Sequence, residues 1–545
     1  MTYYIFVTGG VISGLGKGIA TASIGKVLEA KGFRVTAIKI DPYLNYDAGT
    51  LRPTEHGEVW VTEDGGEIDQ DLGHYERFLD ITLTKDHNIT SGKIYYTVIT
   101  KERRGEYLGQ TVQPIPHVTD EIKAWIRRVA KESNADFTLI EIGGVVGDYE
   151  NVLFLEAARQ MKLEEPDKVI FVHLAYLPLP KTIGELKTKP VQHSVKRLRE
   201  IGIQPDFIIA RSEYPLDDVR KNKIALYCSV NKEDIISDPD LEVVYELPLI
   251  FEEQGFGDKI LKKFNLKPRP SDLSRWREFV NILKYSCKKV RIAIVGKYFR
   301  IGKYKLPDAY ISVIEAVKHA AAYHKAKPEI GYIDVLKIEA EEYDISELSE
   351  YDGIIIPGGF GARGAEGKIK AIEYARLNKI PLLGICYGLQ LMIVEYARNV
   401  CGLDRANSTE IDPDTPYPVI DLLPEQKKIL AESKIGASMR LGAHEVYIKD
   451  GTLAYKVYKS RVVKERFRHR YEVNPEYVPM LEKHGIVFSG ESKDGIKQIC
   501  ELPVDRHPYF IGSQFHPEFT SRPLKPNPLF IGLIKASLNR REGVA

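Results

Sequence analysis

The feature that most constrains the fold of this chain is a series of short, continuously apolar segments separated by helix-like segments. Each segment is four to eight residues long and rich in β-branched side chains. A strand that is apolar on both faces has to be covered on both faces, which is typical of parallel sheets with helices on each side. The segments recur in both halves, so the sequence predicts an α/β fold with two doubly wound parallel-sheet domains. The clearest examples are residues 4–8, 35–40, 137–142, 169–174, 207–210, 290–295, 353–356 and 381–385.

The length of 545 residues also predicts several domains, since one domain usually takes about 100–200 residues. Two prolines in the stretch 266–272 disfavour helix, a helical pattern follows over 274–285, and a new strand starts at Val290. We therefore expect domains at residues 1–266 and 290–545, joined by a linker at 267–289. A loop-rich region over 404–443 is either a functional lid or a solvated insertion. A further helix is expected over 121–131, with Thr119 as its cap.

Composition narrows the class of protein. The chain has 77 basic and 76 acidic residues, a balance that argues against nucleic acid or an acidic membrane surface as its main partner. No apolar run approaches the roughly 18 residues of a bilayer span, and the amino terminus lacks the basic region of a signal peptide. Five scattered cysteines without a Cys-x-x-Cys pair favour a reducing compartment, so we expect a cytoplasmic protein.

A glycine-rich loop follows the first predicted strand. Residues 9–18 read GGVISGLGKG and lead into a helix, a layout that offers backbone N–H groups and Lys17 to a phosphate. The match to a P-loop is incomplete, because Gly18 stands where Ser or Thr would give a metal-facing hydroxyl. A tight structural turn would explain the same residues.

Charged side chains stand near the ends of other predicted strands. Lys39, Asp71 and Glu141 would converge if these strands are neighbours, because open α/β sheets bind ligands at their carboxyl ends. Asp71 with Glu141 is a sensible carboxylate pair for Mg²⁺; each acid could equally be a solvated residue or a helix cap. The basic segment 187–199 could bind a second polyphosphate or form the face of an ordinary helix, and Lys223 resembles any surface lysine.

The sharpest chemical pattern lies in the second half. A buried strand ends in Gly-x-Cys386-x-Gly and continues into a helix, the layout of a nucleophile elbow. His516 and Glu518 supply an imidazole and a carboxylate that can orient it. Glycines at 358–361, together with the N–H of Tyr387, could stabilise an oxyanion. The alternative is an inert buried cysteine.

These motifs resemble two known families. Gly-Ile-Cys-Tyr-Gly-Leu-Gln, His-Pro-Glu and Pro-Gly-Gly-Phe-Gly resemble the class I glutamine amidotransferase domain, a flavodoxin-like Cys-His-Glu glutaminase. The amino-terminal half resembles the P-loop-like, dethiobiotin-synthetase-like synthetase domain of CTP synthases. The matching stretches, which follow the family order over nearly the whole chain, are residues 4–10, 41–45, 72–78, 187–196, 439–442 and 468–474.

The resemblance implies a ligase of pyrimidine biosynthesis. ATP phosphorylates the 4-oxygen of UTP, and ammonia released from glutamine replaces the phosphate to give CTP. It also implies Mg²⁺ as cofactor, allosteric activation by GTP, feedback inhibition by CTP, and a homotetramer whose partners are small molecules.

The resemblance also assigns roles, position by position. In catalysis it implicates Cys386, His516, Glu518, Lys17 and Lys39, and for metal binding Asp71 and Glu141. The ATP residues would be Gly14, Leu15, Gly16, Lys17, Gly18, Ile19, Asp71 and Asp240. The UTP and CTP residues would be Ser13, Asp148, Tyr149, Glu150, Lys187, Thr188, Lys189, Pro190, Val191, Gln192 and Lys223. Glutamine would contact Gly359, Tyr387, Gly388, Leu389, Gln390, Glu410 and Arg470, and GTP would contact Arg363 and Arg440.

Two departures from the family pattern stand out. Gly14 replaces a common serine in the phosphate loop, which removes a hydroxyl but keeps the backbone donors. The segment 296–308 is longer than usual. Two rivals stay open: a ligase that amidates a carboxylate, against which the lysine-rich segment 187–192 argues, and a nucleotide-binding scaffold without catalysis.

Overall fold

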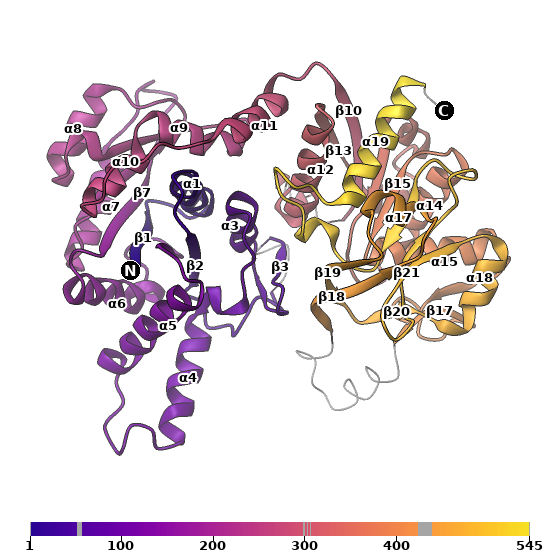
Figure 1. The fold of residues 1–545 in the computed structure, drawn as a ribbon, viewed down its shortest axis with the longest axis horizontal. Helices are drawn as coiled ribbons and strands as arrows, with labels where there is room; N and C mark the ends of the chain where they lie inside the picture. Colours follow the sequence, from indigo (N-terminus) through magenta and orange to yellow (C-terminus); the bar gives the residue numbers. More distant parts are fainter. Residues whose placement is uncertain are drawn as a thin grey trace. The chain divides into compact units, whose positions relative to one another are not determined.

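The computed structural model describes residues 2–51, 57–297, 300–301, 304–305, 307–422 and 439–543. It forms two compact units (Figure 1). The amino-terminal unit comprises Met1–Ala48 and Gln70–Val280, and the carboxy-terminal unit comprises Gly49–Asp69 and Asn281–Ala545. Of the second predicted departure, the loop at 296–308, residues 298–299, 302–303 and 306 lie outside the described residues, as does 423–438 of the loop-rich region.

The amino-terminal unit is built on a seven-stranded sheet in the order β5-β2-β6-β1-β7-β8-β9, in which every neighbouring pair is parallel. Most of its strands are buried along their whole length, because their β-branched and aliphatic residues face helices on both sides. The strands are β1 (Tyr3–Gly10), β2 (Val35–Asp41), β5 (Asn88–Thr90), β6 (Phe137–Ile142), β7 (Val169–Leu177), β8 (Phe207–Ser212) and β9 (Ile235–Pro239).

Helices cover both faces of this sheet. On one face α4, α5 and α6 share a core with strands β1, β2, β6 and β7, and α1 packs against strands on the other face (Figure 1). The helices are α1 (Lys17–Ala30), α3 (Asp71–Leu79), α4 (Ser91–Arg103), α5 (Thr119–Glu132), α6 (Val152–Glu164), α7 (Lys189–Glu200), α8 (Asp218–Cys228), α9 (Leu247–Glu253), α10 (Phe256–Lys263) and α11 (Ser274–Tyr285).

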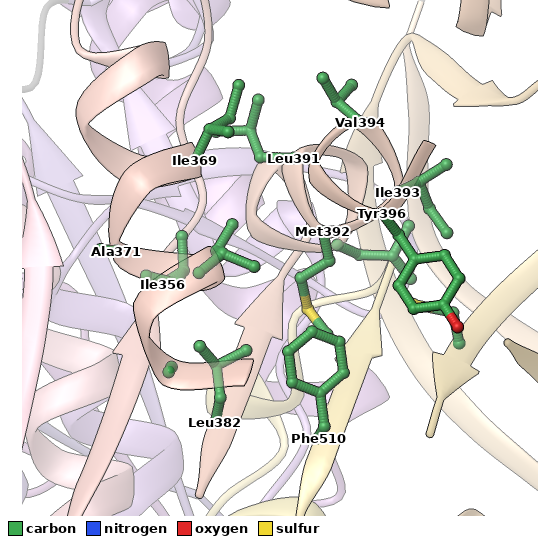
Figure 2. Packing of buried hydrophobic residues seen from close by; sticks show 14 of the residues in the cluster. Ile356, Ile369, Ala371, Leu382, Leu391, Met392, Ile393, Val394, Tyr396 and Phe510 are labelled. Atoms are coloured by element: carbon green, nitrogen blue, oxygen red, sulfur yellow. The ribbon is translucent and has the colours of Figure 1, made fainter. Parts of the chain in front are cut away.

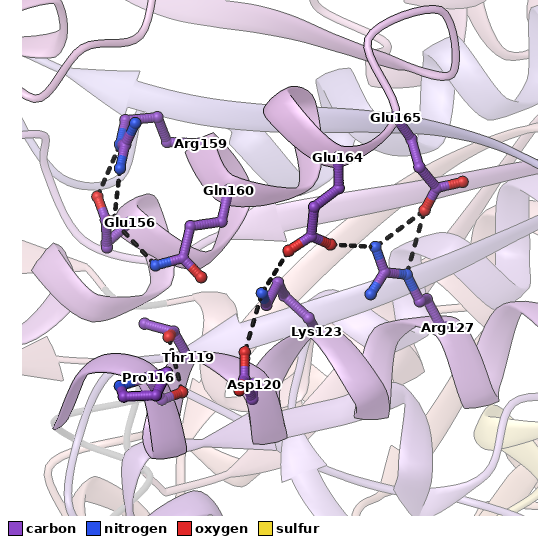
Figure 3. A network of polar contacts seen from close by, with 10 residues as sticks. All are labelled: Pro116, Thr119, Asp120, Lys123, Arg127, Glu156, Arg159, Gln160, Glu164 and Glu165. Carbon is purple, nitrogen blue, oxygen red and sulfur yellow. Dashed lines mark hydrogen bonds and ion pairs between the residues drawn. The ribbon is translucent and has the colours of Figure 1, made fainter. Parts of the chain in front are cut away.

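Ion pairs join the outer faces of α5 and α6 (Figure 3). Lys123 bonds Glu164 at 2.6 Å and Asp120 at 2.9 Å, and Arg127 bonds Glu164 at 2.6 Å. The predicted cap was wrong: Thr119 is the first residue of α5, and its hydroxyl donates to the Pro116 carbonyl at 2.9 Å. A turn of helix at Pro114–Val118 directly precedes α5, so the helical segment starts earlier in the sequence than Thr119.

The carboxy-terminal unit carries a nine-stranded sheet in the order β13-β10-β14-β15-β23-β22-β21-β18-β19. The first five strands are parallel, whereas β22, β21, β18 and β19 continue the sheet as antiparallel neighbours. The predicted α/β class is therefore confirmed, and the antiparallel extension adds to it. Its strands are β10 (Lys289–Gly296), β13 (Lys327–Asp334), β14 (Gly353–Ile356), β15 (Leu382–Ile385), β18 (Arg440–Ile448), β19 (Val462–His469), β21 (Val487–Glu491), β22 (Lys497–Glu501) and β23 (Phe510–Ser513).

Smaller elements complete this unit. The helices are α12 (Ile311–Tyr323), α13 (Val335–Glu339), α14 (Ala365–Leu377), α15 (Tyr387–Asn399), α17 (Leu453–Tyr458), α18 (Val478–His484) and α19 (Pro528–Glu542). The remaining strands are β3 (Val59–Val61), β4 (Glu67–Asp69), β11 (Arg300–Ile301), β12 (Tyr304–Lys305), β16 (Ala406–Ser408), β17 (Tyr417–Leu422) and β20 (Tyr471–Val473). In the part of the chain described, no helix combines the length and apolarity that a membrane crossing needs.

Helices α14 and α15 pack on strands β14, β15 and β23 through a dense apolar core (Figure 2). Two strand glycines, Gly384 and Gly512, allow this close packing. A Cβ on Gly384 would lie 2.4 Å from the sulfur of Met392, and one on Gly512 would lie 3.0 Å from it. Helix α15 therefore sits tightly over the strand that leads to Cys386.

Candidate active sites

The glycine loop of the amino-terminal unit lies between β1 and α1. Gly14 and Gly16 adopt positive φ angles of 71° and 85°, which glycine accommodates without strain. Lys17 crosses back over Gly9, where a Cβ would lie 2.7 Å from the lysine side chain, and its Nζ donates to the Gly144 carbonyl at 2.7 Å. Burial lowers the pKa of Lys17. The loop thus places an ammonium and the start of a helix at one point, an arrangement that suits phosphate.

A cluster of buried charges surrounds Lys39. Residues Lys39 and Glu141 lie opposite each other on the neighbouring strands β2 and β6, and their side chains bond at 2.9 Å. The same ammonium also bonds Asp71 and lies 3.7 Å from Asp41. Burial opposes the charge on Lys39, but the nearby carboxylates outweigh it and raise its pKa well above the usual value.

The carboxylates of this cluster respond differently to their surroundings. Burial raises the pKa of Glu141, which also accepts a hydrogen bond from Tyr75. Burial acts in the same direction on Asp71, but Lys39 dominates and lowers its pKa. Asp71 begins α3, and a Cβ on Gly18 would lie 2.4 Å from its Oδ1. Glycine at position 18, which departs from the P-loop pattern, therefore makes room for Asp71.

The donor set of this cluster fits Mg²⁺. That ion usually takes one or two carboxylates and completes its shell with substrate phosphates and water. Asp71 and Glu141 offer two carboxylates around one point, since both bond the same ammonium. Within the described residues, no group of three or more His, Cys, Asp or Glu side chains could hold a metal without such a substrate.

The predicted nucleotide residues are less closely connected. Asp148 accepts from the N–H of Val145 at 2.8 Å, and Tyr149 is 97% exposed. Gln192 donates to Thr188 at 3.1 Å across the first turn of α7. Asp240 bonds Arg211 at 2.8 Å. These contacts do not join the predicted nucleotide residues to the Lys39 cluster, so their roles stay predictions.

Cys386 lies at the junction of β15 and α15. Its backbone has φ of 52° and ψ of −102°, a strained conformation for a residue with a side chain. Two contacts maintain it: the Cys386 N–H donates to the Ser513 carbonyl at 2.6 Å, and Gly388 lets the helix approach β14. A Cβ on Gly388 would lie 2.2 Å from the Ile356 carbonyl oxygen. This geometry is that of a nucleophile elbow, which presents the thiol beside a helix amino terminus.

His516 lies beside this thiol and interacts with it. Its Nδ1 bonds Glu518 Oε1 at 2.7 Å, which leaves Nε2 for proton exchange with Cys386. Burial opposes a charged ring, but Glu518 and Cys386 outweigh it and raise the pKa of His516 to about 10. A Cβ on Gly358 would lie 3.0 Å from His516 Cε1 and 3.8 Å from Cys386 Cβ. Thus the structure brings together the nucleophile, its base and the glycine loop.

Two buried lysines support that glycine loop, and the sequence analysis missed both. Lys368, only 1% exposed, donates to the Pro357 carbonyl at 2.7 Å. Lys297 donates to the carbonyls of Phe360 and, at 3.2 Å, Arg363. Burial, with the charge of Lys297, lowers the pKa of Lys368 to about 7. Lysine in an otherwise ordinary helix or strand gives no sequence signal of such a role.

A cavity of about 400 Å³ opens beside the thiol. Of the predicted glutamine residues, Gly359, Gln390, Glu410 and Arg470 line it, whereas Tyr387, Gly388 and Leu389 are buried in α15. Glu410 accepts from the N–H of Gly361 at 2.9 Å. The cavity is lined by Gly49, Thr50, Leu51, Glu58, Val59, Ala309, Tyr310, Val313, Gly358, Gly359, Phe360, Cys386, Gln390, Glu410, Met439, Arg468, His469, Arg470, Tyr471, His516, Glu518 and Phe519.

The predicted GTP residues lie apart from the triad contacts. Arg440 is 3.7 Å from the buried carboxylate of Glu472 and covers the ring of Phe467. Arg363 is exposed, and its carbonyl accepts from Lys297. Their assignment stays a prediction.

Comparison with known proteins gives matches over both units. Residues 3–266 match the family model described as CTP synthase N-terminus, and residues 305–536 match glutamine amidotransferase class-I. The CTP synthase of Pyrococcus abyssi is 57% identical over 540 residues, which is 98% of each chain. That of Methanocaldococcus jannaschii is 54% identical over 545 residues, 99% of each chain.

A solved structure is also similar. It is titled the glutaminase domain of Trypanosoma brucei CTPS with bound acivicin, and is 36% identical with a TM-score of 0.41. The similarity covers 46% of this chain and 93% of that chain.

The Cys386–His516–Glu518 centre and the second family match together define a glutamine amidotransferase, an enzyme that hydrolyses glutamine. The first match and the full-length relatives narrow this class. The chain belongs to the CTP synthase family, and it is a glutamine-hydrolysing ligase.

Proposed function

We propose that the chain converts UTP to CTP, using ATP and ammonia from glutamine, as the last step of de novo CTP synthesis. The observation that carries the proposal is the full-length similarity to CTP synthases in a chain that contains both a charged phosphate site and a Cys–His–Glu centre. The two centres divide the reaction into phosphoryl transfer and nitrogen supply.

In the glutaminase centre, the Nε2 of His516 takes the thiol proton of Cys386. The thiolate attacks the carboxamide carbon of glutamine, and the N–H groups of Gly359 and Tyr387 stabilise the oxyanion. The imidazolium returns its proton to the leaving nitrogen, and ammonia departs. Water then hydrolyses the thioester to glutamate. Glu518 holds the ring through Nδ1 during both proton transfers.

In the synthetase centre, Lys17 and the N–H groups of the glycine loop bind the phosphates of ATP. The 4-oxygen of UTP attacks the terminal phosphorus of ATP, the bond to the bridging oxygen breaks and ADP leaves, and ammonia then adds to carbon 4 and displaces phosphate. Lys39 balances the charge that moves in this transfer. Asp71 and Glu141 would hold Mg²⁺, which neutralises phosphate charge when bound.

The remaining assignments extend this proposal. Residues 148–150, 187–192, 223 and Ser13 would form the site for UTP and for CTP as feedback inhibitor, and Asp240 would contact ATP. Arg363 and Arg440 would serve GTP as allosteric activator. Residues 1–266 and 290–545 would act as synthetase and glutaminase domains around the linker 267–289, in a cytoplasmic homotetramer.

A paired assay tests the proposal. The purified chain is supplied with ATP, Mg²⁺ and UTP, and with either ammonia or glutamine, in the presence and absence of GTP. CTP should form from either nitrogen source, and GTP should accelerate only the glutamine reaction. Absence of CTP with ammonia would overturn the substrate assignment.

A further inference from the structure

A hairpin encoded in the first 70 residues belongs to the carboxy-terminal unit. Strands β3 and β4 pair in register from Val59 with Asp69 to Val61 with Glu67. They fall within the segment that matches the CTP synthase N-terminus, yet their contacts group them with the glutaminase. The side chain of Trp60 is fully buried there.

Strand β19 holds this hairpin through basic side chains at alternating positions. Because strand side chains alternate between faces, residues 464, 466 and 468 share one face. Arg466 donates to the Val61 carbonyl at 3.0 Å and covers the ring of Trp60. Arg468 bonds Glu67 at 2.8 Å. Lys464 pairs with Glu63 at the exposed end.

The backbone of these same β19 residues contacts the catalytic pair. The Arg466 carbonyl accepts from the N–H of His516 at 2.8 Å. The Arg468 carbonyl lies 3.7 Å from the Cys386 sulfur, within reach of its S–H. Two consecutive residues on one face of the strand therefore bind the hairpin with their side chains and the reacting groups with their backbone.

Aromatic rings make a second connection. The ring of Trp60 lies 4.9 Å from that of Phe519, and Phe519 stacks on the imidazole of His516 at 5.0 Å with an interplanar angle of 15°. This stack limits rotation of the imidazole about its Cβ–Cγ bond, because that rotation would tilt the ring against Phe519. Neither connection is needed to close the hairpin itself, whose strands already pair through their backbones.

We propose that the β3–β4 hairpin is a positioning element of the glutaminase, in which Trp60 holds Phe519 and Arg466 so that His516 stays aligned with Cys386. The inference rests on the proposed glutamine hydrolysis. It assigns a glutaminase role to a segment of the synthetase half of the sequence.

Full-length variants test this role. Trp60→Leu removes the ring but keeps an apolar side chain, and Trp60→Phe restores an aromatic contact. We expect Trp60→Leu to lower kcat for glutamine hydrolysis about tenfold with KM within twofold, and Trp60→Phe to recover most of it. CTP synthesis from ammonia should stay within twofold, since that reaction does not use the thiol.

A matched control separates positioning from stability. Phe488 on β21 is equally buried in the same unit and packs in the core around α15. Phe488→Leu removes a ring elsewhere in the unit, so it should lower thermal stability but leave kcat for glutamine hydrolysis within twofold.

The reactivity of Cys386 gives a second readout. Iodoacetamide alkylation at neutral pH reports the thiolate that His516 generates, and it is followed at Cys386 by mass spectrometry because the exposed Cys287 would react as well. We expect the rate to fall about fivefold in Trp60→Leu and to stay unchanged in Phe488→Leu.

The outcomes separate the inference from the function on which it rests. A wild-type chain that hydrolyses no glutamine would overturn the proposed function. An active wild type with an equally active Trp60→Leu variant would overturn the positioning role alone. Equal losses of glutamine-dependent and ammonia-dependent synthesis would also overturn it, because the hairpin would then serve the whole fold.

Discussion

The two candidate centres both lie at carboxyl ends of parallel strands, yet they are organised by different forces. Around Lys39, three carboxylates surround one ammonium at 3.7 Å or less, so attraction between unlike charges arranges the side chains. Around Cys386, backbone geometry fixes the nucleophile, through the φ of 52° and the 2.6 Å bond from its N–H to the Ser513 carbonyl, and one side-chain bond of 2.7 Å joins His516 to Glu518.

This difference predicts how each centre responds to change. Where attraction between charged side chains holds a centre together, its activity depends on every one of those side chains and on charged ligands. A centre held by backbone geometry depends on packing around the loop and strand that carry it. The following variants test whether the two centres differ in this way.

The largest effect should come from the thiol. Cys386→Ala should reduce glutamine-dependent CTP synthesis at least about 10³-fold, because no covalent intermediate can form. Synthesis from ammonia should stay near the wild-type rate. Measuring CTP from each nitrogen source checks this, and loss of both activities in a folded variant would contradict the separation of the centres.

Lys17→Ala should have the next largest effect and should affect both nitrogen sources. Its ammonium bonds the Gly144 carbonyl beside the glycine loop, and losing a charged phosphate contact of this kind costs about 10²-fold or more in rate. The assay is CTP formation from ammonia and from glutamine. Lys26→Ala, which removes another lysine of α1, is the control, and near-normal turnover in Lys17→Ala would reject the phosphate role.

Lys368→Met should reduce kcat for glutamine hydrolysis about tenfold. Its Nζ holds the Pro357 carbonyl, and this fixes the first peptide plane of the glycine loop that carries the Gly359 N–H. Lys370→Met, two residues along α14 and outside this contact, should leave kcat unchanged. Steady-state kinetics decide: a variant with normal kcat and raised KM would show that the lysine serves binding rather than the loop.

The smallest effect on rate is expected at Glu472, where the change concerns stability; this residue lies on β20, in the three-stranded sheet β16-β17-β20. Burial raises the pKa of Glu472 to about 8, although Arg440 opposes this. With the folded pKa above the unfolded one, Glu472 costs no stability below its unfolded pKa, and the stability of the wild type that depends on this residue is lost as pH rises from about 4.5 to about 8. Glu472→Gln should therefore add about 4 kcal/mol to the free energy of unfolding at pH 8 and less than about 1 kcal/mol at pH 5, since the pKa rises from 4.5 to about 8 and each pKa unit corresponds to about 1.4 kcal/mol.

Denaturant unfolding of the carboxy-terminal unit at both pH values checks this. The exposed Glu476, changed to Gln, is the matched control and should leave the pH dependence as it is. An equal shift at pH 5 and pH 8 in Glu472→Gln would show that charge is not the cause.

Sequence patterns predicted the buried parallel strands well, because continuous apolar runs have few other structures available. The segments 137–142 and 353–356 coincide with β6 and β14, β15 is one residue shorter than the predicted 381–385, and the other predicted strands are one to three residues longer than expected. The Cys386 elbow was also predictable, since adjacent small residues are a local signal of a sharp turn.

Contacts between distant segments were not predictable. Strand β19 reads as ordinary alternating sequence, and nothing in it indicates that Arg466 and Arg468 bind residues 61 and 67. Lys368 likewise resembles a surface lysine, although it is buried beneath the glycine loop. Both depend on tertiary contacts that a single sequence does not encode locally.

The placement of residues 49–69 has a practical consequence for dissecting the enzyme. A cut at the linker near residue 280 would assign Trp60 and Glu67 to one fragment and their partners Phe519 and Arg468 to the other. The carboxy-terminal fragment would then present an uncovered aromatic ring and unpaired arginines to solvent. A glutaminase fragment made by such a cut would lack part of its own fold. Fusing residues 49–69 to the carboxy-terminal fragment should restore these contacts.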